Sequence, residues 1–164
     1  TDGGTSSRVF GSFLSWMQEK KSPVFVVATA NDVTQLPPEF LRKGRFDELF
    51  FVDLPNQQER EAIWGIQIGK YGRKPKGYNL GALSIGSEGF TGAEIEQAYI
   101  EGLYEAFQKG KEPDTVGLST ILAKQVPLSR LMGEQIAALR QWAQGRARPA
   151  TSQQSGGNTR KIAA

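Results

Sequence analysis

The sequence contains neither cysteine nor histidine among its 164 residues. Without cysteine the chain can form no disulfide bond and no thiolate metal site. Without histidine it lacks the commonest metal ligand and the usual general base at neutral pH. Serine or cysteine triads and zinc chemistry are therefore excluded, and we expect this chain to build no metal site of its own.

Long hydrophobic runs are also missing. No segment approaches the roughly 18 consecutive apolar residues that a membrane-spanning helix needs, and the N-terminal TDGGTSSRVF has neither the charged nor the apolar region of a signal peptide. We therefore expect no contact with a membrane. Because the chain lacks an initiating methionine and begins with a Gly/Ser/Thr-rich stretch, we also expect it to be a fragment of a longer polypeptide.

Acidic side chains are absent from the C-terminal segment, residues 146–164, which carries four basic ones. The rest of the chain holds 16 of the 20 basic residues and all 17 acidic ones, so the net charge of +3 originates mostly in this segment. Its Ser/Gln/Gly/Asn-rich composition without periodicity predicts a disordered, basic tail. Nucleic-acid binding has the least support, because four dispersed bases would bind weakly and only at low salt.

The N-terminal part combines one helix with two buried strands. Apolar residues at helical spacing predict an amphipathic helix that ends near Lys20, with Ser6 or Ser7 as N-cap. The continuously apolar VFVVATA, beginning at residue 24, predicts a strand covered on both faces in a parallel sheet. LPPEF predicts a turn followed by one helical turn, and ELFFVDLP contains a second buried strand at 49–54.

From residue 56 onward the pattern is helical. Asn56 with Glu59, and Thr91 with Glu94, have the spacing of capping boxes and predict two helix starts. A short helix on NLGALSI should precede the second of these. Further helices are predicted near 118–124 and around Met132, Ile136, Leu139 and Ala143. The Thr91 helix is expected to bury one face, made of Ile95, Ala98, Tyr99, Leu103, Ala106 and Phe107.

The order of VFVVATAND, LPPEFLRKGRFD and FFVDLP resembles the second region of homology of the AAA family of ATPases, and the helices that follow resemble that family's lid. The resemblance covers residues 7–145. Within the family, GTSSRVFGSFLSWMQEKKSPVFVVATAN and PLSRLMGEQIAALRQWAQGRARPA resemble the uncharacterised AAA proteins of cyanobacteria and algal chloroplast genomes. The implied fold is α/β. Residues 1–55 would end the nucleotide-binding α/β subdomain with two parallel strands, 56–145 would form the α-helical lid, and 146–164 would form the tail.

The resemblance assigns three residues of the N-terminal part to catalysis. Asn31 matches sensor 1, an amide that would orient the attacking water and contact the γ-phosphate, and the alternative is an asparagine in an ordinary turn. Arg42 and Arg45 match the pair of arginine fingers that reaches into the nucleotide site of a neighbouring subunit. Gly44 between them permits a sharp turn. The alternative is a surface turn whose arginines form ordinary salt bridges.

The lid supplies the expected contacts with the cofactor. GFTGAEIEQA matches the sensor-2 region, with Gly92 and Ala93 where many branches of the family have an arginine. This difference indicates the branch of AAA proteins related to unfoldases and remodelling enzymes. Gln67 occupies the position at which many members of that branch place a histidine against the adenosine.

No P-loop or Walker B pattern is present. GIQIGKY has three residues rather than four between its glycines, ends in Tyr71 instead of Ser or Thr, and lies within a helical pattern. We therefore expect the phosphate cradle and the Mg²⁺ ligands upstream, and no tight ATP binding or hydrolysis by this chain alone. Since the P-loop strand would separate strands 24–29 and 49–54, their edges should be open and the N-terminal half marginally stable.

The resemblance implies that the intact parent couples ATP hydrolysis, with Mg²⁺, to the remodelling of an unknown protein partner. Identical subunits would form a ring, a hexamer by analogy with the family, in the cyanobacterial cytoplasm or chloroplast stroma. The stretch DGGTSS is either a pore-lining loop or a plain linker. The alternative from another class is a non-hydrolysing assembly module that uses the same surfaces.

Overall fold

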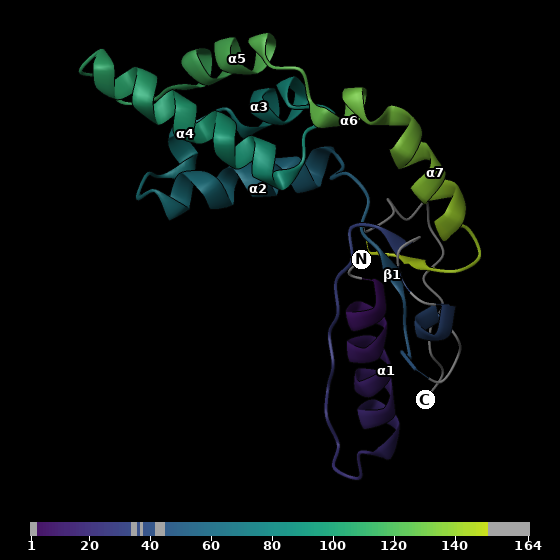
Figure 1. Ribbon diagram of the computed structural model, residues 1–164. Coiled ribbons are helices and arrows are strands. Elements are labelled where there is room, and N and C mark those ends of the chain that lie inside the picture. The colour runs from purple at the N-terminus through teal and green to yellow at the C-terminus, as the bar shows by residue number, and fades with distance from the viewer. Residues whose placement is uncertain (1–2, 34–35, 37, 42–44, 151–164) are drawn as a thin grey trace, which may run out of the picture. The chain divides into compact units, whose positions relative to one another are not determined.

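A computed structural model of the chain describes residues 3–33, 36, 38–41 and 45–150 (Figure 1). The chain forms two compact units, Thr1–Leu49 and Phe50–Ala164. Within the described residues, no helix has both the length and the apolar character needed to cross a membrane. The fold is mixed, with helices and a two-stranded parallel sheet, as the α/β fold class predicts.

The first unit contains helix α1, Gly3–Glu19. The predicted amphipathic helix is confirmed, but the expected caps at Ser6 and Ser7 are wrong, because the helix already begins at Gly3. Once a helix is nucleated, each added residue contributes one hydrogen bond, so a flanking polar stretch is readily drawn in. Residues 3–7 are therefore helical, and the expectation of a loop or linker there is corrected.

A cluster of phenylalanines holds α1 against the short 3₁₀ helix η2, Pro38–Leu41. Phe40 is buried and lies at its centre. Its ring meets Phe10 edge-on at 5.1 Å between centroids and stacks on Phe13 at 6.4 Å and Phe46 at 6.1 Å. Aromatic contacts of this kind add to the burial of apolar area. The predicted single helical turn after LPPEF is thus confirmed.

The strand predicted at VFVVATA is wrong. Residues 23–30 carry no regular secondary structure, and Phe25 and Val27 are 94% and 75% exposed. A strand exists only where a neighbour satisfies its backbone N–H and C=O groups. The apolar pattern encodes burial within a sheet, but the described part of the chain supplies no neighbouring strand to this segment.

The second predicted strand is present over a shorter range. Strand β1, Phe50–Phe51, pairs in parallel with β2, Arg148–Pro149, so the edge expected to be open is occupied. The backbone N–H of Ala150 extends the pairing by donating to the carbonyl of Phe51 at 2.8 Å. The expectation of a disordered tail is therefore wrong for residues 146–150, and residues 151–164 lie outside the described part of the chain.

Four helices build the lid in the second unit. They are α2, Gln57–Lys70, α3, Leu80–Gly86, α4, Gly92–Gln108, and α5, Thr115–Lys124, and a 3₁₀ helix, η3, Pro75–Gly77, connects the first two (Figure 1). The predicted helix starts at Asn56 and Thr91 are confirmed. The shared core consists of Trp64, Ile68, Leu83, Phe90, Ile95, Ala98, Tyr99, Leu118, Ile121 and Leu122.

The buried face of α4 differs from the predicted one at its C-terminal end. Phe107 is 83% exposed, and Gly102, which the pattern did not include, is buried. Positions 95, 98, 99, 102 and 106 keep the helical period, and Phe107 lies about 100° past the last of them. A Cβ on Gly102 would lie 2.4 Å from Cδ2 of Leu118, so glycine allows α5 to approach closely.

Two helices follow the lid core. They are α6, Leu128–Leu131, which the sequence pattern did not predict, and α7, Gly133–Ala143, which it did. The backbone N–H of Leu128 donates to Oε1 of Glu94 at 2.7 Å, which fixes the start of α6 at the N-terminus of α4.

Candidate functional site

A groove of about 660 Å³ lies in the second unit, where the segment after β1 enters the lid. The first turns of α2, the start of α4, and α7 form its walls. The lining is predominantly apolar, with a few polar groups, as in ligand-binding grooves generally. It comprises Phe51, Val52, Asp53, Leu54, Pro55, Glu59, Ala62, Ile63, Thr91, Gly92, Ile136, Leu139 and Ala150.

Two capping boxes stand at this groove. Oδ1 of Asn56 accepts from the N–H of Glu59 at 3.0 Å, and Oε2 of Glu59 accepts from the N–H of Asn56 at 2.9 Å. Thr91 and Glu94 form the same pair of bonds, at 3.2 and 2.8 Å. These bonds satisfy N–H groups that would otherwise be exposed at a helix start. The N-termini of α2 and α4 are thus capped by side chains of the same segments.

The carboxylate of Glu94 also joins α4 to α6. Partial burial alone would raise the pKa of Glu94, but hydrogen bonds from the N–H groups of Thr91 and Leu128 and from the Thr91 hydroxyl outweigh this effect. The pKa of Glu94 is therefore lowered. An ionised Glu94 holds the α4 end of the groove in place.

Gly92 and Ala93, both predicted to contact the cofactor, differ in their position relative to the groove. Gly92 lines the groove, and a Cβ built on it would lie 3.9 Å from Cδ1 of Ile63, an ordinary contact distance. Ala93 is exposed and is not part of the lining. Only the first of the two residues therefore borders the groove.

Gln67 carries a buried side-chain oxygen, Oε1, that has no hydrogen-bond partner within the described part of the chain. Ile63 and Lys70 flank it, four residues before and three after, and thus lie on the same face of α2. Ile63 lies nearest to Gly92, while Lys70 forms an ion pair with Glu96. Gln67 therefore lies on the face of α2 that meets the first turns of α4.

The three predicted catalytic residues belong to the first unit. Asn31 is exposed just after the unpaired segment 23–30. Arg45 is half-buried, and its Nη1 donates to the carbonyl of Leu14 at 3.5 Å, a long hydrogen bond. Arg42 lies outside the described residues. Of the predicted site residues that the structure describes, Gly92 lines the groove, whereas Gln67 and Ala93 are not part of its lining.

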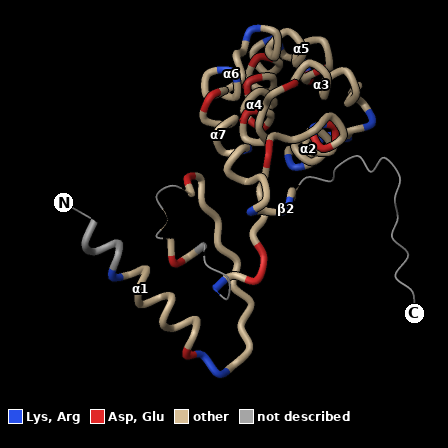
Figure 2. Tube along the Cα trace, turned by 90° about the vertical axis from the view of Figure 1, so that its right-hand side faces the viewer, with Lys and Arg blue, Asp and Glu red and all other residues tan. Residues whose placement is uncertain are grey.

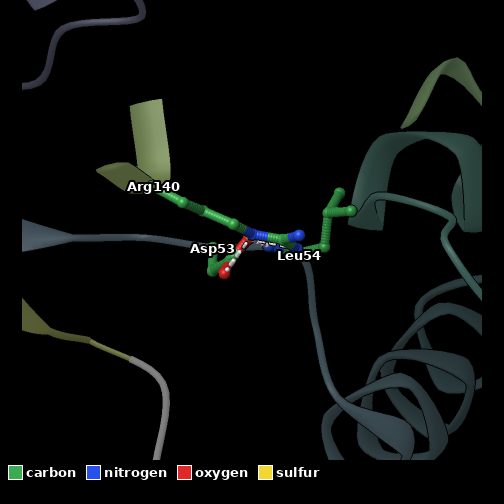
Figure 3. Close-up of polar contacts among 3 residues, drawn as sticks. All are labelled: Asp53, Leu54 and Arg140. Carbon is green, nitrogen blue, oxygen red and sulfur yellow. Dashed lines mark hydrogen bonds and ion pairs between the residues drawn. The ribbon is translucent and has the colours of Figure 1, made fainter. Parts of the chain in front are cut away.

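Asp53 and Arg140 form a contact that sequence reasoning missed. Nε of Arg140 donates to Oδ1 and Oδ2 of Asp53 at 3.0 and 2.8 Å, and Nη2 donates to Oδ1 at 2.9 Å (Figure 3). These bonds to Asp53 raise the pKa of Arg140 above its usual value. The two residues are 87 positions apart, and no local pattern in the sequence connects them.

The second unit carries charges of both signs, and helix α4 carries acidic residues only (Figure 2). Several basic side chains of the lid are paired with acidic ones, as in Lys70–Glu96, Arg73–Glu112 and Lys109–Glu105. Such pairing does not favour a phosphate-binding surface on the lid. Within the described residues, no cluster of three or more acidic, His or Cys side chains is arranged to hold a metal ion.

Comparison with known proteins matches residues 1–54 to the family "ATPase family associated with various cellular activities (AAA)". The chain is 51% identical over 152 residues to "Uncharacterized AAA domain-containing protein ycf46" of Pyropia yezoensis, covering 92% of this chain and 31% of that protein. The protein of the same name from Guillardia theta is 47% identical over 145 residues, 87% of this chain and 28% of its own length.

A third relative comes from a different group. The chain is 37% identical over 93 residues to "Proteasome-activating nucleotidase" of Saccharolobus islandicus, covering 57% of this chain and 23% of that protein. A parallel strand that leads into a capped helical lid, with a groove at the junction, defines a module of the α/β-plus-lid class. The chain belongs to the AAA family and contains the end of its α/β subdomain and its helical lid.

Proposed function

We propose that the chain is the C-terminal part of an ATPase module that, in the intact protein, couples ATP binding and hydrolysis to the remodelling of a protein partner. Family membership supports nucleotide binding, and the apolar groove that Gly92 lines supports the place where the base binds. The buried, unpaired oxygen of Gln67 on α2 is a separate observation that supports a polar contact nearby. The chain spans 31% and 28% of the length of the two algal relatives, so this activity is proposed for the whole protein.

The groove fits the base of a nucleotide. An apolar wall suits a planar ring, and the side chain of Ile63 forms part of such a wall beside Gly92. The buried Oε1 of Gln67 accepts a hydrogen bond and has no partner within the described residues, so an N–H group of a base would satisfy it. We assign Gly92, which lines the groove, and Gln67 and Ala93, which lie outside its lining, to base binding.

The phosphates and Mg²⁺ require groups outside the chain. Both helix N-termini at the groove are already capped, so they offer no ready anion site. When ATP and Mg²⁺ are bound, they supply the phosphoryl group and the charge neutralisation for its transfer. The residues present therefore fit one end of the nucleotide.

Asn31, Arg42 and Arg45 act on the phosphates in this proposal. Asn31 orients the attacking water, and the two arginines reach the nucleotide of a neighbouring subunit. The contact of Arg45 with Leu14 is long and uses one of five guanidinium N–H donors, so it is easily exchanged for a stronger partner. Arginines that act in trans require a ring of identical subunits, for which we propose a hexamer.

The partner and compartment follow from the relatives. Similarity to a proteasome-activating nucleotidase favours a protein as the molecule acted upon. The algal relatives favour the chloroplast stroma, or the cytoplasm of cyanobacteria, as the place of action.

A non-hydrolysing assembly module is the second candidate. The capped helix ends favour it, because their N–H groups are already bonded to side chains and offer no ready anion site. In that case the arginines would serve as contacts between subunits. The two candidates differ in what the arginines contribute to turnover.

Arg45→Ala in the intact protein tests the proposal. A guanidinium supplied in trans is worth roughly 10³ to 10⁵ in rate, so ATP turnover should fall by at least about 10³ while nucleotide affinity changes little. Specific activity of the unaltered protein should rise with protein concentration as subunits associate. Arg8→Ala, an exposed arginine on α1, is the matched control and should retain turnover. Full turnover in Arg45→Ala, or none in the unaltered protein, would favour the assembly module.

A further inference from the structure

The chain after α6 turns away from the lid. We call residues 133–150, which comprise α7 and β2, the C-terminal strap. Within the described residues, the core of the lid draws on α2 to α5 and Phe90 and includes no residue of this strap. The strand pairing of the strap and its Arg140–Asp53 ion pair are directed to residues 50–55, which comprise β1 and the segment that leads to α2.

A side chain provides the first anchor. The guanidinium of Arg140 meets the carboxylate of Asp53 through two nitrogens, a geometry that a planar fork suits and a lysine could not reproduce (Figure 3). The N–H of Leu54 donates to Oδ1 of Asp53 at 2.7 Å, so the backbone of the same segment orients the carboxylate. The pair is partly exposed, with side chains 49% and 31% accessible.

The backbone provides a second anchor, independent of side-chain identity. Phe50 lies opposite Arg148 and Phe51 opposite Pro149 in a parallel register. The N–H of Ala150 donates to Phe51. The strap therefore binds on both sides of Val52, once to the strand and once to Asp53.

Apolar contacts provide the third anchor. Ile136, Leu139, Arg140 and Ala143 have the i, i+3, i+4, i+7 spacing of one helix face. Two of them, Ile136 and Leu139, line the groove opposite Val52 and Leu54, and Ala143 is buried. The face of α7 that carries the arginine also carries the apolar wall.

We propose that the C-terminal strap is an intramolecular clamp on the hinge at residues 52–55, and that Arg140 is its positioning residue. With the clamp closed, α7 forms one wall of the groove. The segment between β1 and α2 is then held in one conformation by the Arg140–Asp53 pair and the pairing of β1 with β2. When Arg140 releases Asp53, the wall loosens without loss of the lid, because the strap contributes nothing to the lid core. The inference does not depend on which ligand fills the groove.

Amide hydrogen exchange of the 164-residue chain, measured by NMR, tests this clamp. In the unaltered chain the Ala150 N–H should be protected. In Arg140→Ala its exchange should accelerate by about fivefold or more, as expected for loss of an exposed but bidentate pair. The Tyr99 amide in α4 should keep its rate, which shows that the lid has not unfolded.

Two further variants make the test specific. Lys109→Ala removes an exposed ion pair within α4 and should leave the Ala150 rate unchanged. Asp53→Arg combined with Arg140→Asp should exchange more slowly at Ala150 than Arg140→Asp alone, because the pair is restored with its charges reversed. An unprotected Ala150 amide in the unaltered chain, an unchanged rate in Arg140→Ala, or no recovery in the double variant would overturn the clamp.

Discussion

At the scale of single residues, the buried oxygen of Gln67 stands out because, within the described residues, no other buried side-chain nitrogen or oxygen lacks a hydrogen-bond partner. The indole N–H of Trp64 donates to Ser87 at 3.0 Å, and the Ser87 hydroxyl donates to the carbonyl of Leu83 at 2.8 Å. A buried acceptor without a partner costs roughly 1 to 3 kcal/mol. A position that carries such a cost in the free chain is a candidate for ligand binding.

Replacing Gln67 with leucine should therefore separate stability from binding. The free energy of unfolding of the chain should stay equal or rise by up to about 1 kcal/mol, because the unpaired polar group is removed. In the intact protein the affinity for ATP should fall by about tenfold, the worth of one hydrogen bond to the base. Urea denaturation and calorimetric titration measure the two effects.

Gln97→Leu provides the matched control, since Gln97 is an exposed glutamine on α4. It should change neither quantity by more than a few tenths of a kcal/mol. Unchanged ATP affinity in Gln67→Leu would contradict the role assigned to this residue in base binding.

At the scale of elements, two glycines on neighbouring helices meet different surroundings. Gly102 on α4 faces Leu118, while a Cβ on Gly69 of α2 would meet no atom within 4 Å. The same substitution therefore tests close helix packing at one position and helix propensity at the other.

Gly102→Ala should lower the free energy of unfolding by about 1 to 3 kcal/mol, because α4 and α5 must move apart to accommodate the methyl group. Gly69→Ala, the matched control, should raise it by up to about 1 kcal/mol through better helix propensity. Urea denaturation followed by circular dichroism measures both. Equal effects of the two substitutions would show that α5 does not approach α4 as closely as described.

Elements also show where sequence patterns are reliable. The starts of α2 and α4 were predicted because a capping box is complete within four residues, Asn56 to Glu59 and Thr91 to Glu94. The strand predicted at VFVVATA is wrong, because a strand depends on a partner that its own residues do not contain. Phe107 was placed in the core by its period, but the extent of that face is decided by where α5 lies.

At the scale of the whole molecule, the described residues form one wall of the proposed nucleotide site and offer few groups for phosphates. No P-loop pattern occurs in the sequence, and both helix N-termini at the groove are capped by their own side chains. The Mg²⁺ ligands and the phosphate cradle are therefore expected in other parts of the intact protein.

The 164-residue chain alone should show no saturable ATP binding in a calorimetric titration and no ATP turnover. Base contacts with Gln67 and Ile63 can supply only a small part of the binding energy of a nucleotide. The intact protein, titrated under the same conditions, is the positive control. Saturable binding by the isolated chain would mean that the groove holds phosphates as well as the base.

The sequence by itself determined the family, the capped starts of α2 and α4 and the contribution of α4 to the lid core, because these depend on spacings within a few residues. Of the residues that the resemblance assigned to the cofactor, Gly92 lines the groove, and the base site itself stays a prediction. Only the tertiary structure decided that β2 pairs with β1 and that Arg140 holds Asp53. It also decided that, within the described residues, segment 23–30 pairs with no strand and the buried Gln67 oxygen has no hydrogen-bond partner. Each of these depends on which segments distant along the chain meet in space, and no local pattern encodes that.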